Sequence, residues 1–181
     1  MTMKLLKPNH PHLHTKIETF DFNNPPEDPV EIAEKLKTAL GDWKGVGLSA
    51  NQIGLPYRVF AINTDPVMIC FNPKITYYSE ESAVMNETCL TFPLLFVRIR
   101  RSEIIRARFV DEHNEIRTHG FDGVVSRAFQ HEIDHLDGNM YLTRASKYNL
   151  EKAKHKTKMI KRKLKKQDKL IKSLQGTIHG N

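Results

Sequence analysis

The stretch that most restricts how this chain can fold is QHEIDHLDG at residues 130–138, where two histidines stand four positions apart. On an α-helix such residues lie one above the other, so His131 and His135 can direct ring nitrogens at a single ion. Glu132 then projects about 100° away, within reach of a water beside that ion. The alternative is a helix whose histidines are simply buried and hydrogen-bonded. If an ion is bound, a different segment must supply a third ligand.

A catalytic zinc-type site needs three protein ligands and one open position. Cys89, in NETCLTFP, is the candidate third ligand. A free cysteine is often only a small buried hydrophobe, and that interpretation fits Cys70, within VMICFNP, better. Two cysteines are too few for a disulfide scaffold and indicate a reducing compartment.

The segment KGVGLSANQIGLP, residues 44–56, combines three glycines with an amide side chain directly before a strand-like stretch. Glycines allow close backbone approach to a ligand, and Gln52 could donate a hydrogen bond to a developing oxyanion. The spacing is not that of a dinucleotide-binding motif. Taken alone, the segment is more typical of a tight surface turn.

The spacing of apolar residues predicts two helices in the first 145 residues. One runs over 29–40, capped by Asp28 and closed by Gly41. The other begins after a cap at Asp122, carries the two histidines and ends at Gly138, which can adopt the left-handed conformation.

Between these helices the sequence predicts strands, and their grouping favours antiparallel pairing. The stretches concerned are YRVFAI, VMICF, KITYY and EIIRARFV, with DEHN as a hairpin loop before EIRTHGF. We therefore expect an α+β fold in which antiparallel strands pack around a central metal-binding helix, with an N-terminal helix and a basic C-terminal helix.

The basic residues are concentrated near the C-terminus. Residues 147–172 hold twelve Lys or Arg against Glu151 and Asp168, a net charge of +10, so the rest of the chain carries about −3 of the total of +7. The same segment predicts an amphipathic helix with one apolar stripe. The stripe consists of Ala153, Ile160, Leu164, Ile171 and Leu174. We expect two units, a catalytic domain over 1–145 and a lysine-rich helical extension over 146–181.

The first residues, MTMKLLKPNH, lack the apolar core of a signal peptide and the composition of a transit peptide. The longest apolar runs are far too short to span a membrane. We expect a soluble, cytoplasmic protein.

Taken together and in order, three segments resemble the motifs of the peptide deformylase family. GVGLSANQ resembles its Gly-x-Gly-x-Ala-Ala-x-Gln motif, ETCLT its Glu-Gly-Cys-Leu-Ser motif and QHEIDH its Gln-His-Glu-x-Asp-His motif. The resemblance covers roughly residues 3–145 and is to the bacterial or phage type, with a basic extension added. Ser49, Thr88 and Thr91 depart from the usual Ala, Gly and Ser.

The resemblance implies hydrolysis of the N-formyl group from the formylmethionine end of nascent polypeptides, with release of formate. Cys89, His131 and His135 would ligate the metal, and Glu132 would be the general acid and base. Gln52 and the backbone N–H of Leu90 would form the oxyanion hole. The remaining implied residues contact the substrate: Val46, Gly47, Thr88, Val124 and Ala128.

Family members typically hold Fe²⁺, and Zn²⁺, Ni²⁺ or Co²⁺ also suit one thiolate with two imidazoles. The resemblance implies formylmethionyl peptides as substrates. The basic helix suggests the ribosome or its RNA as a further partner. We expect no membrane partner. Two other functions stay open. A general peptidase would use the same histidine motif without a cysteine ligand, and a non-catalytic RNA-binding protein would not need Glu132.

Overall fold

The computed structural model describes residues 3–178, with side chains described up to residue 172. Three α-helices, seven strands and three short 3-10 helices follow one another in this part of the chain. The helices are α1 (Pro29–Trp43), α2 (Gly123–Leu136) and α3 (Lys147–Ile178), and the 3-10 helices are η1 (Pro11–His14), η2 (Ala50–Ile53) and η3 (Tyr141–Arg144). The strands are β1 (Gly47–Ser49), β2 (Val59–Ile62), β3 (Met68–Tyr78), β4 (Ser82–Cys89), β5 (Phe92–Ser102), β6 (Ile105–Val110) and β7 (Ile116–Phe121).

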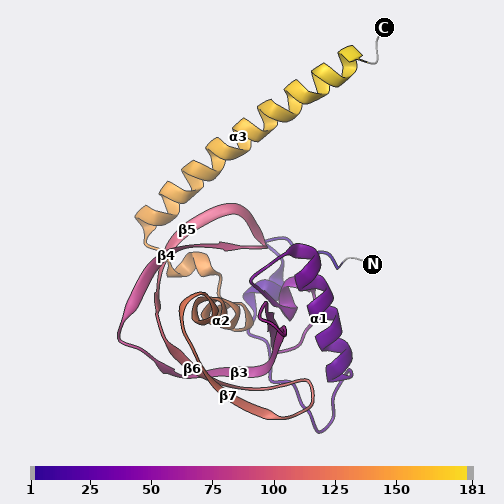
Figure 1. Cartoon of the computed structure of the whole chain (residues 1–181), viewed down its shortest axis with the longest axis vertical. Helices are drawn as coiled ribbons and strands as arrows, with labels where there is room; N and C mark the ends of the chain where they lie inside the picture. The colour runs from indigo at the N-terminus through magenta and orange to yellow at the C-terminus, as the bar shows by residue number, and fades with distance from the viewer. Residues whose placement is uncertain (1–2, 179–181) are drawn as a thin grey trace.

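The strands form two antiparallel sheets around α2, as predicted for the fold class. One sheet has the order β1-β2-β3-β6-β7, and the other is the β4–β5 hairpin. Figure 1 shows α2 near the centre, with the sheets curving around it and α1 on the far side of the larger sheet. The β4–β5 hairpin brings the end of β4 close to α2, which begins more than thirty residues later in the sequence.

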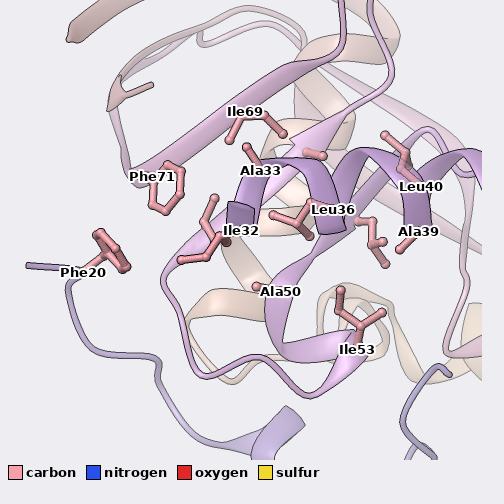
Figure 2. Close-up of a cluster of buried hydrophobic side chains, with 13 residues drawn as sticks. Phe20, Ile32, Ala33, Leu36, Ala39, Leu40, Ala50, Ile53, Ile69 and Phe71 are labelled. Carbon is pink, nitrogen blue, oxygen red and sulfur yellow. The ribbon is translucent and has the colours of Figure 1, made fainter. Parts of the chain in front are cut away.

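The apolar face of α1 packs on β1, β2 and β3 to form one part of the core. Figure 2 shows Ile32 beside Phe71 and Ala33 beside Ile69 of β3, with Leu36, Ala39 and Leu40 further along the same helix. The helix is capped as predicted, since Asp28 accepts a hydrogen bond from Val30 N at 2.9 Å. Burial of this stripe fixes β1, and with it the segment that leads to η2.

Two further apolar clusters surround α2 and the hairpin. Phe129 and Leu136 of α2 pack against Phe60 and Ile105 in the larger sheet. On the other side, Val97 and Ile99 of β5 pack with Tyr141 and with Ala153 of α3. The helix α2 also contacts β5 and η3, so it is held between the larger sheet and the hairpin, as expected for an element that carries functional groups.

Several local predictions need correction. The first helix does not close at Gly41 but continues to Trp43, and Lys44 adopts the left-handed cap conformation with φ 51°. VMICF and KITYY are not two strands but the single strand β3, which passes through a bulge at Asn72 with φ 49°. Residues 47–53 are not a surface turn either, because Leu48 to Gln52 are buried.

The basic C-terminal helix forms as predicted, and its two halves differ. Ala153 is buried against the hairpin, and the Thr157 hydroxyl donates to the carbonyl of Leu94 at 2.9 Å. Beyond these turns α3 extends away from the body (Figure 1). Ile160, Leu164 and Ile171 of the predicted stripe are exposed, and the side chain of Leu174 lies outside the described residues. No helix in the described part of the chain is long and apolar enough to cross a membrane.

Candidate metal centre

Cys89, His131 and His135 lie together in the interior, with one ligand atom from each within 4.8 Å of the others. The two histidines are on neighbouring turns of α2, and their ring centroids are 5.0 Å apart. Cys89 is the last residue of β4, and its Sγ lies 3.1 Å from His135 Nε2. All three side chains are buried. A soft thiolate beside two imidazoles suits Fe²⁺, Zn²⁺, Ni²⁺ or Co²⁺, so these donors fit a divalent metal ion.

Neighbouring groups fix the ring of His131 and the backbone of His135. His131 Nδ1 donates to Glu87 Oε2 at 3.2 Å, which leaves Nε2 directed at the site. The ring of Tyr141 lies 5.3 Å from the His131 ring, and its hydroxyl donates to Leu95 O at 2.7 Å. The backbone at His135 is held by Asn51, whose Nδ2 donates to the His135 carbonyl at 2.7 Å. The His131 ring is thus positioned before any ion binds, whereas His135 Nδ1 is buried with no hydrogen-bond partner among the described residues.

The protonation states favour ligation. Burial opposes ionisation of Cys89, but the facing rings of His135 and His131 lower the pKa of its thiol well below the ordinary value. The site therefore favours the thiolate, which is the form that ligates a metal. Burial also opposes the charged form of His131, yet Cys89 and Glu87 raise its pKa to about 10. The two shifts describe one buried pair, the Cys89 thiolate and the His131 imidazolium. A metal ion that binds here would replace the proton that the pair shares.

Glu132 lies beside the ligands and against the backbone of β1. Its carboxyl is buried, its Oε2 has no hydrogen-bond partner among the described residues, and burial raises its pKa. A Cβ placed on Gly47 would come within 2.6 Å of Glu132 Oε1. The absence of a side chain at Gly47 thus makes the room that the carboxyl occupies.

The Gln52 amide faces the thiol of Cys89. Its Oε1 accepts hydrogen bonds from the backbone N and the hydroxyl of Ser49, at 3.0 and 3.1 Å. Its Nε2 therefore points the other way, donating to Thr91 Oγ1 at 3.1 Å and lying 3.4 Å from Cys89 Sγ. Leu90, whose N–H is the second expected donor, is half-buried in the tight turn between β4 and β5.

The residues expected to contact substrate lie at the edges of this site. Val46 and Val124 are exposed apolar side chains, whereas Ala128 is buried in the turn of α2 before His131. Gly47 opens β1, and Thr88 is exposed between the buried residues Glu87 and Cys89.

Sequence reasoning did not identify the ionic network behind the ligands. Glu87 accepts from Arg101 Nε at 2.7 Å and Nη2 at 2.9 Å, and Arg101 Nη1 donates to Asp134 at 2.9 Å. Burial opposes ionisation of Glu87, but His131 and Arg101 lower its pKa to about 2. Strand alternation buries Arg101 and exposes its neighbours Arg98 and Arg100.

Comparisons of the sequence and of the fold with known proteins point to one family. Residues 2–151 match the family model described as polypeptide deformylase. A peptide deformylase of Pseudothermotoga lettingae is 33% identical over 116 residues, which are 64% of this chain and 68% of that protein. One of Bartonella tribocorum is 31% identical over 147 residues, covering 77% and 79% of the two chains. The crystal structure of the Thermotoga maritima peptide deformylase superposes with a TM-score of 0.75 at 29% identity, covering 81% of this chain and 99% of that one.

Proposed function

This chain belongs to the polypeptide deformylase family, and from that membership we propose which of its residues carry out the reaction. It is a hydrolase that removes the N-formyl group from nascent peptides, and it uses a metal. We assign Cys89, His131 and His135 as the ligands. The observation that carries this assignment is the buried cluster of one thiol and two imidazoles, next to a carboxyl that has an unpartnered oxygen.

Glu132 is the proton-transfer group. A bound divalent ion supplies a Lewis acid that activates water and polarises the formyl carbonyl. The carboxylate of Glu132 accepts the proton that water loses as it attacks the formyl carbon. It then delivers that proton to the departing α-amine, and formate is released. Its buried position against Gly47 keeps the carboxyl at one place throughout.

Gln52 and Leu90 stabilise the charge that develops on the formyl oxygen. Ser49 already fixes the Gln52 amide with its N–H donors toward Cys89, so little reorganisation is needed during the reaction. The Leu90 N–H, in the turn directly after Cys89, is the second donor.

The substrate peptide lies across the exposed edge of the site. Val46, Val124 and Ala128 offer apolar surface for the methionine side chain, and backbone groups at Gly47 and Thr88 pair with the extended peptide. The side chain of Thr88 is exposed and not among the ligands, so it leaves the chemistry unaltered.

Fe²⁺ is the physiological ion in this proposal, with Zn²⁺, Ni²⁺ and Co²⁺ as substitutes, since all accept one thiolate and two imidazoles. Nascent chains carry formylmethionine at the place where they are synthesised. We therefore infer a cytoplasmic location for an enzyme that acts on them.

Formate release from formyl-Met-Ala-Ser tests the assignment, under anaerobic conditions with added Fe²⁺. Glu132→Ala removes the proton carrier and should lower kcat by about 10²–10⁴-fold while the metal is retained. Glu103→Gln, at an exposed position, is the matched control and should keep full activity. Equal rates for Glu132→Ala and the unaltered chain would overturn the mechanism.

We further propose that residues 1–145 form the catalytic unit and that the extension 146–181 contacts the ribosome or its RNA. The net charge of +10 on residues 147–172 supports this, as does a groove of about 510 Å³ beside α3. The groove has an apolar floor that includes Phe92 and Leu95, and it is edged by basic residues of α3. These are Lys154, Lys158, Lys161, Arg162 and Lys165.

The triple variant Lys161→Gln, Arg162→Gln, Lys165→Gln tests the contact by co-sedimentation with ribosomes. Binding should weaken and lose part of its salt dependence, while activity on the short peptide stays unchanged. Lys7, Lys16 and Lys74 are exposed on the body, and their replacement by Gln is the charge-matched control. Any truncation should begin after residue 158, because Ala153 and Thr157 pack on the hairpin. Equal binding by both triple variants would remove this proposal.

A further inference from the structure

Arg127 is a buried arginine on the same helix as the two histidines. It stands one turn before His131 and is only 9% exposed. A guanidinium in the interior is costly unless it is paired and hydrogen-bonded, and its Nε is buried with no partner among the described residues. Neither helix propensity nor apolar packing explains why an arginine is buried at this position. The hydrogen bonds of its Nη1 and Nη2 atoms must therefore explain it.

These contacts join α2 to both strands of the β4–β5 hairpin. Arg127 Nη2 donates to the carbonyl of Ala83 on β4 at 2.8 Å, and Nη1 donates to that of Ile99 on β5 at 3.2 Å. The helix carries the two histidine ligands and the hairpin carries Cys89. The position of the hairpin relative to α2 thus sets the distances between the thiol and the imidazoles, and Arg127 bonds directly across that junction.

Arg127 also contacts the Glu87 carboxylate, which is the partner of His131 Nδ1. Its Nη1 donates to Glu87 Oε1, which already accepts from Arg101 Nε at 2.7 Å. Two guanidinium groups therefore occupy Oε1. The other oxygen, Oε2, accepts from Arg101 Nη2 at 2.9 Å and from His131 Nδ1 at 3.2 Å. Arg101 thus holds both oxygens of Glu87, and Arg127 adds a second guanidinium at Oε1, so removal of Arg127 would leave the carboxylate that orients His131 held by one arginine instead of two.

We propose that Arg127 is a positioning residue for the metal centre: it locks the Glu87 carboxylate against His131 and holds the Cys89 hairpin at a fixed distance from α2. It acts through Glu87 and the two strands, without touching the metal or the peptide. This inference rests on the ligand set proposed above. A planar fork is required because the acceptors are divided between two nitrogens, Glu87 and Ile99 at Nη1 and Ala83 at Nη2, whereas an ammonium group offers a single nitrogen.

The cobalt-loaded protein provides the test. Arg127→Met preserves length and bulk, Arg127→Lys preserves charge, and Arg100→Met is the control. Arg100 lies on β5 too but is exposed, donating to Ser82 Oγ at 3.0 Å. The measurements are the visible absorption of bound Co²⁺, its dissociation constant by competition with a chelator, and kcat and KM for formyl-Met-Ala-Ser.

Arg127→Met should weaken Co²⁺ binding about 10–100-fold, shift the ligand-field bands and lower kcat with KM unchanged. Arg127→Lys should recover part of the affinity, and Arg100→Met should match the unaltered protein. If Arg127→Met does not fold, Arg127→Lys carries the test, with a smaller shift in the same direction.

Two results separate the possible failures. Lack of a thiolate-to-cobalt absorption band in the unaltered protein would refute the ligand set itself. A normal band there, with the same spectrum and affinity in the Arg127 variants, would overturn only the role of Arg127. A raised KM with unchanged kcat would also overturn it, because Arg127 would then act on the substrate.

Discussion

At the scale of single residues, the contact between Gly47 and Glu132 sets the place of the proton carrier. Gly47→Ala would put a Cβ within 2.6 Å of Glu132 Oε1, closer than real contacts allow, so the carboxyl must move. A misplacement of about 1 Å can cost about 10²-fold in rate. We expect kcat for formyl-Met-Ala-Ser to fall by that order, with metal content unchanged.

Gly41→Ala is the control for this substitution. Gly41 lies inside α1, and an added Cβ there meets nothing within 4 Å. It should leave activity unchanged and stabilise the helix by about 0.5–1 kcal/mol. Full activity in Gly47→Ala would contradict the assigned position of Glu132.

Ser49 is a residue whose departure from the family motif has a visible consequence. Its hydroxyl adds a second hydrogen bond to Gln52 Oε1, beside the one from its own backbone N. Ser49→Ala removes the hydroxyl, whose bond to Gln52 is worth about 1 kcal/mol, or roughly fivefold in rate if all of it is used in the transition state, and which also interacts with Glu132. Steady-state kinetics should show a lower kcat and little change in KM. An unchanged kcat would mean that the backbone bond alone fixes the amide.

The sequence could anticipate some site residues and not others, for a physical reason. The pairing of His131 with His135 follows from helical spacing alone. Glu87 and Arg127, by contrast, act across elements forty residues apart, and nothing local in either segment records that contact. A buried arginine on a helix carries no periodic signal that would distinguish it from an exposed one.

At the scale of secondary-structure elements, the β6–β7 hairpin was predicted from its loop, and Asp111 shows why it forms. One oxygen of Asp111 accepts from the backbone N of His113 and of Glu115, both at 3.0 Å, and the other accepts from Arg117 at 2.8 Å. Asn114, with φ 63°, completes the turn. The local chemistry of these five residues thus fixes the register of two strands.

Asp111→Ala should lower the free energy of unfolding by about 1–2 kcal/mol near neutral pH, measured by urea denaturation. Burial opposes ionisation of Asp111, but these hydrogen bonds lower its pKa below the ordinary 3.8. The stabilisation is therefore fully present above the unfolded pKa and is lost as the pH falls through the lower folded value. The difference between the two proteins should shrink below about pH 4. A difference that stayed constant with pH would refute the role of the carboxylate.

Strands β4 and β5 were not predicted as strands, although they carry the cysteine. The run SAVMNETC has little alternation because its outward face is exposed and its inward face holds Glu87 and Cys89. A strand whose buried side is a polar site lacks the apolar pattern on which prediction depends. In β3, the bulge at Asn72 lets a single strand contain Asn-Pro, which ordinarily marks a turn.

At the scale of the whole molecule, three apolar clusters surround the centre, so the body should stay folded without metal. Ion binding adds stability by mass action, about 2.7 kcal/mol at a free ion concentration one hundred times Kd. For a chain of this size we expect chelation to lower Tm by about 5–10 °C, measured by calorimetry with and without Co²⁺.

Two cysteine variants make this measurement specific. Cys70 is buried in β3, away from the ligands, and Cys70→Ala should keep the dependence of Tm on metal. Cys89→Ala should lose it. The same dependence in both variants would mean that the ion is held elsewhere.

The outer half of α3 projects from the body as an isolated rod (Figure 1). The thirteen residues of α3 beyond the groove, 166–178, add about 20 Å to the longest dimension while contributing little mass. Frictional drag grows with that length, so a single chain of 20.9 kDa should elute early from a sizing column, as a larger sphere does. Its sedimentation coefficient should be low for its mass, and tumbling about the long axis should be faster than end over end. Early elution of this protein therefore reflects its elongated shape. It does not by itself show self-association.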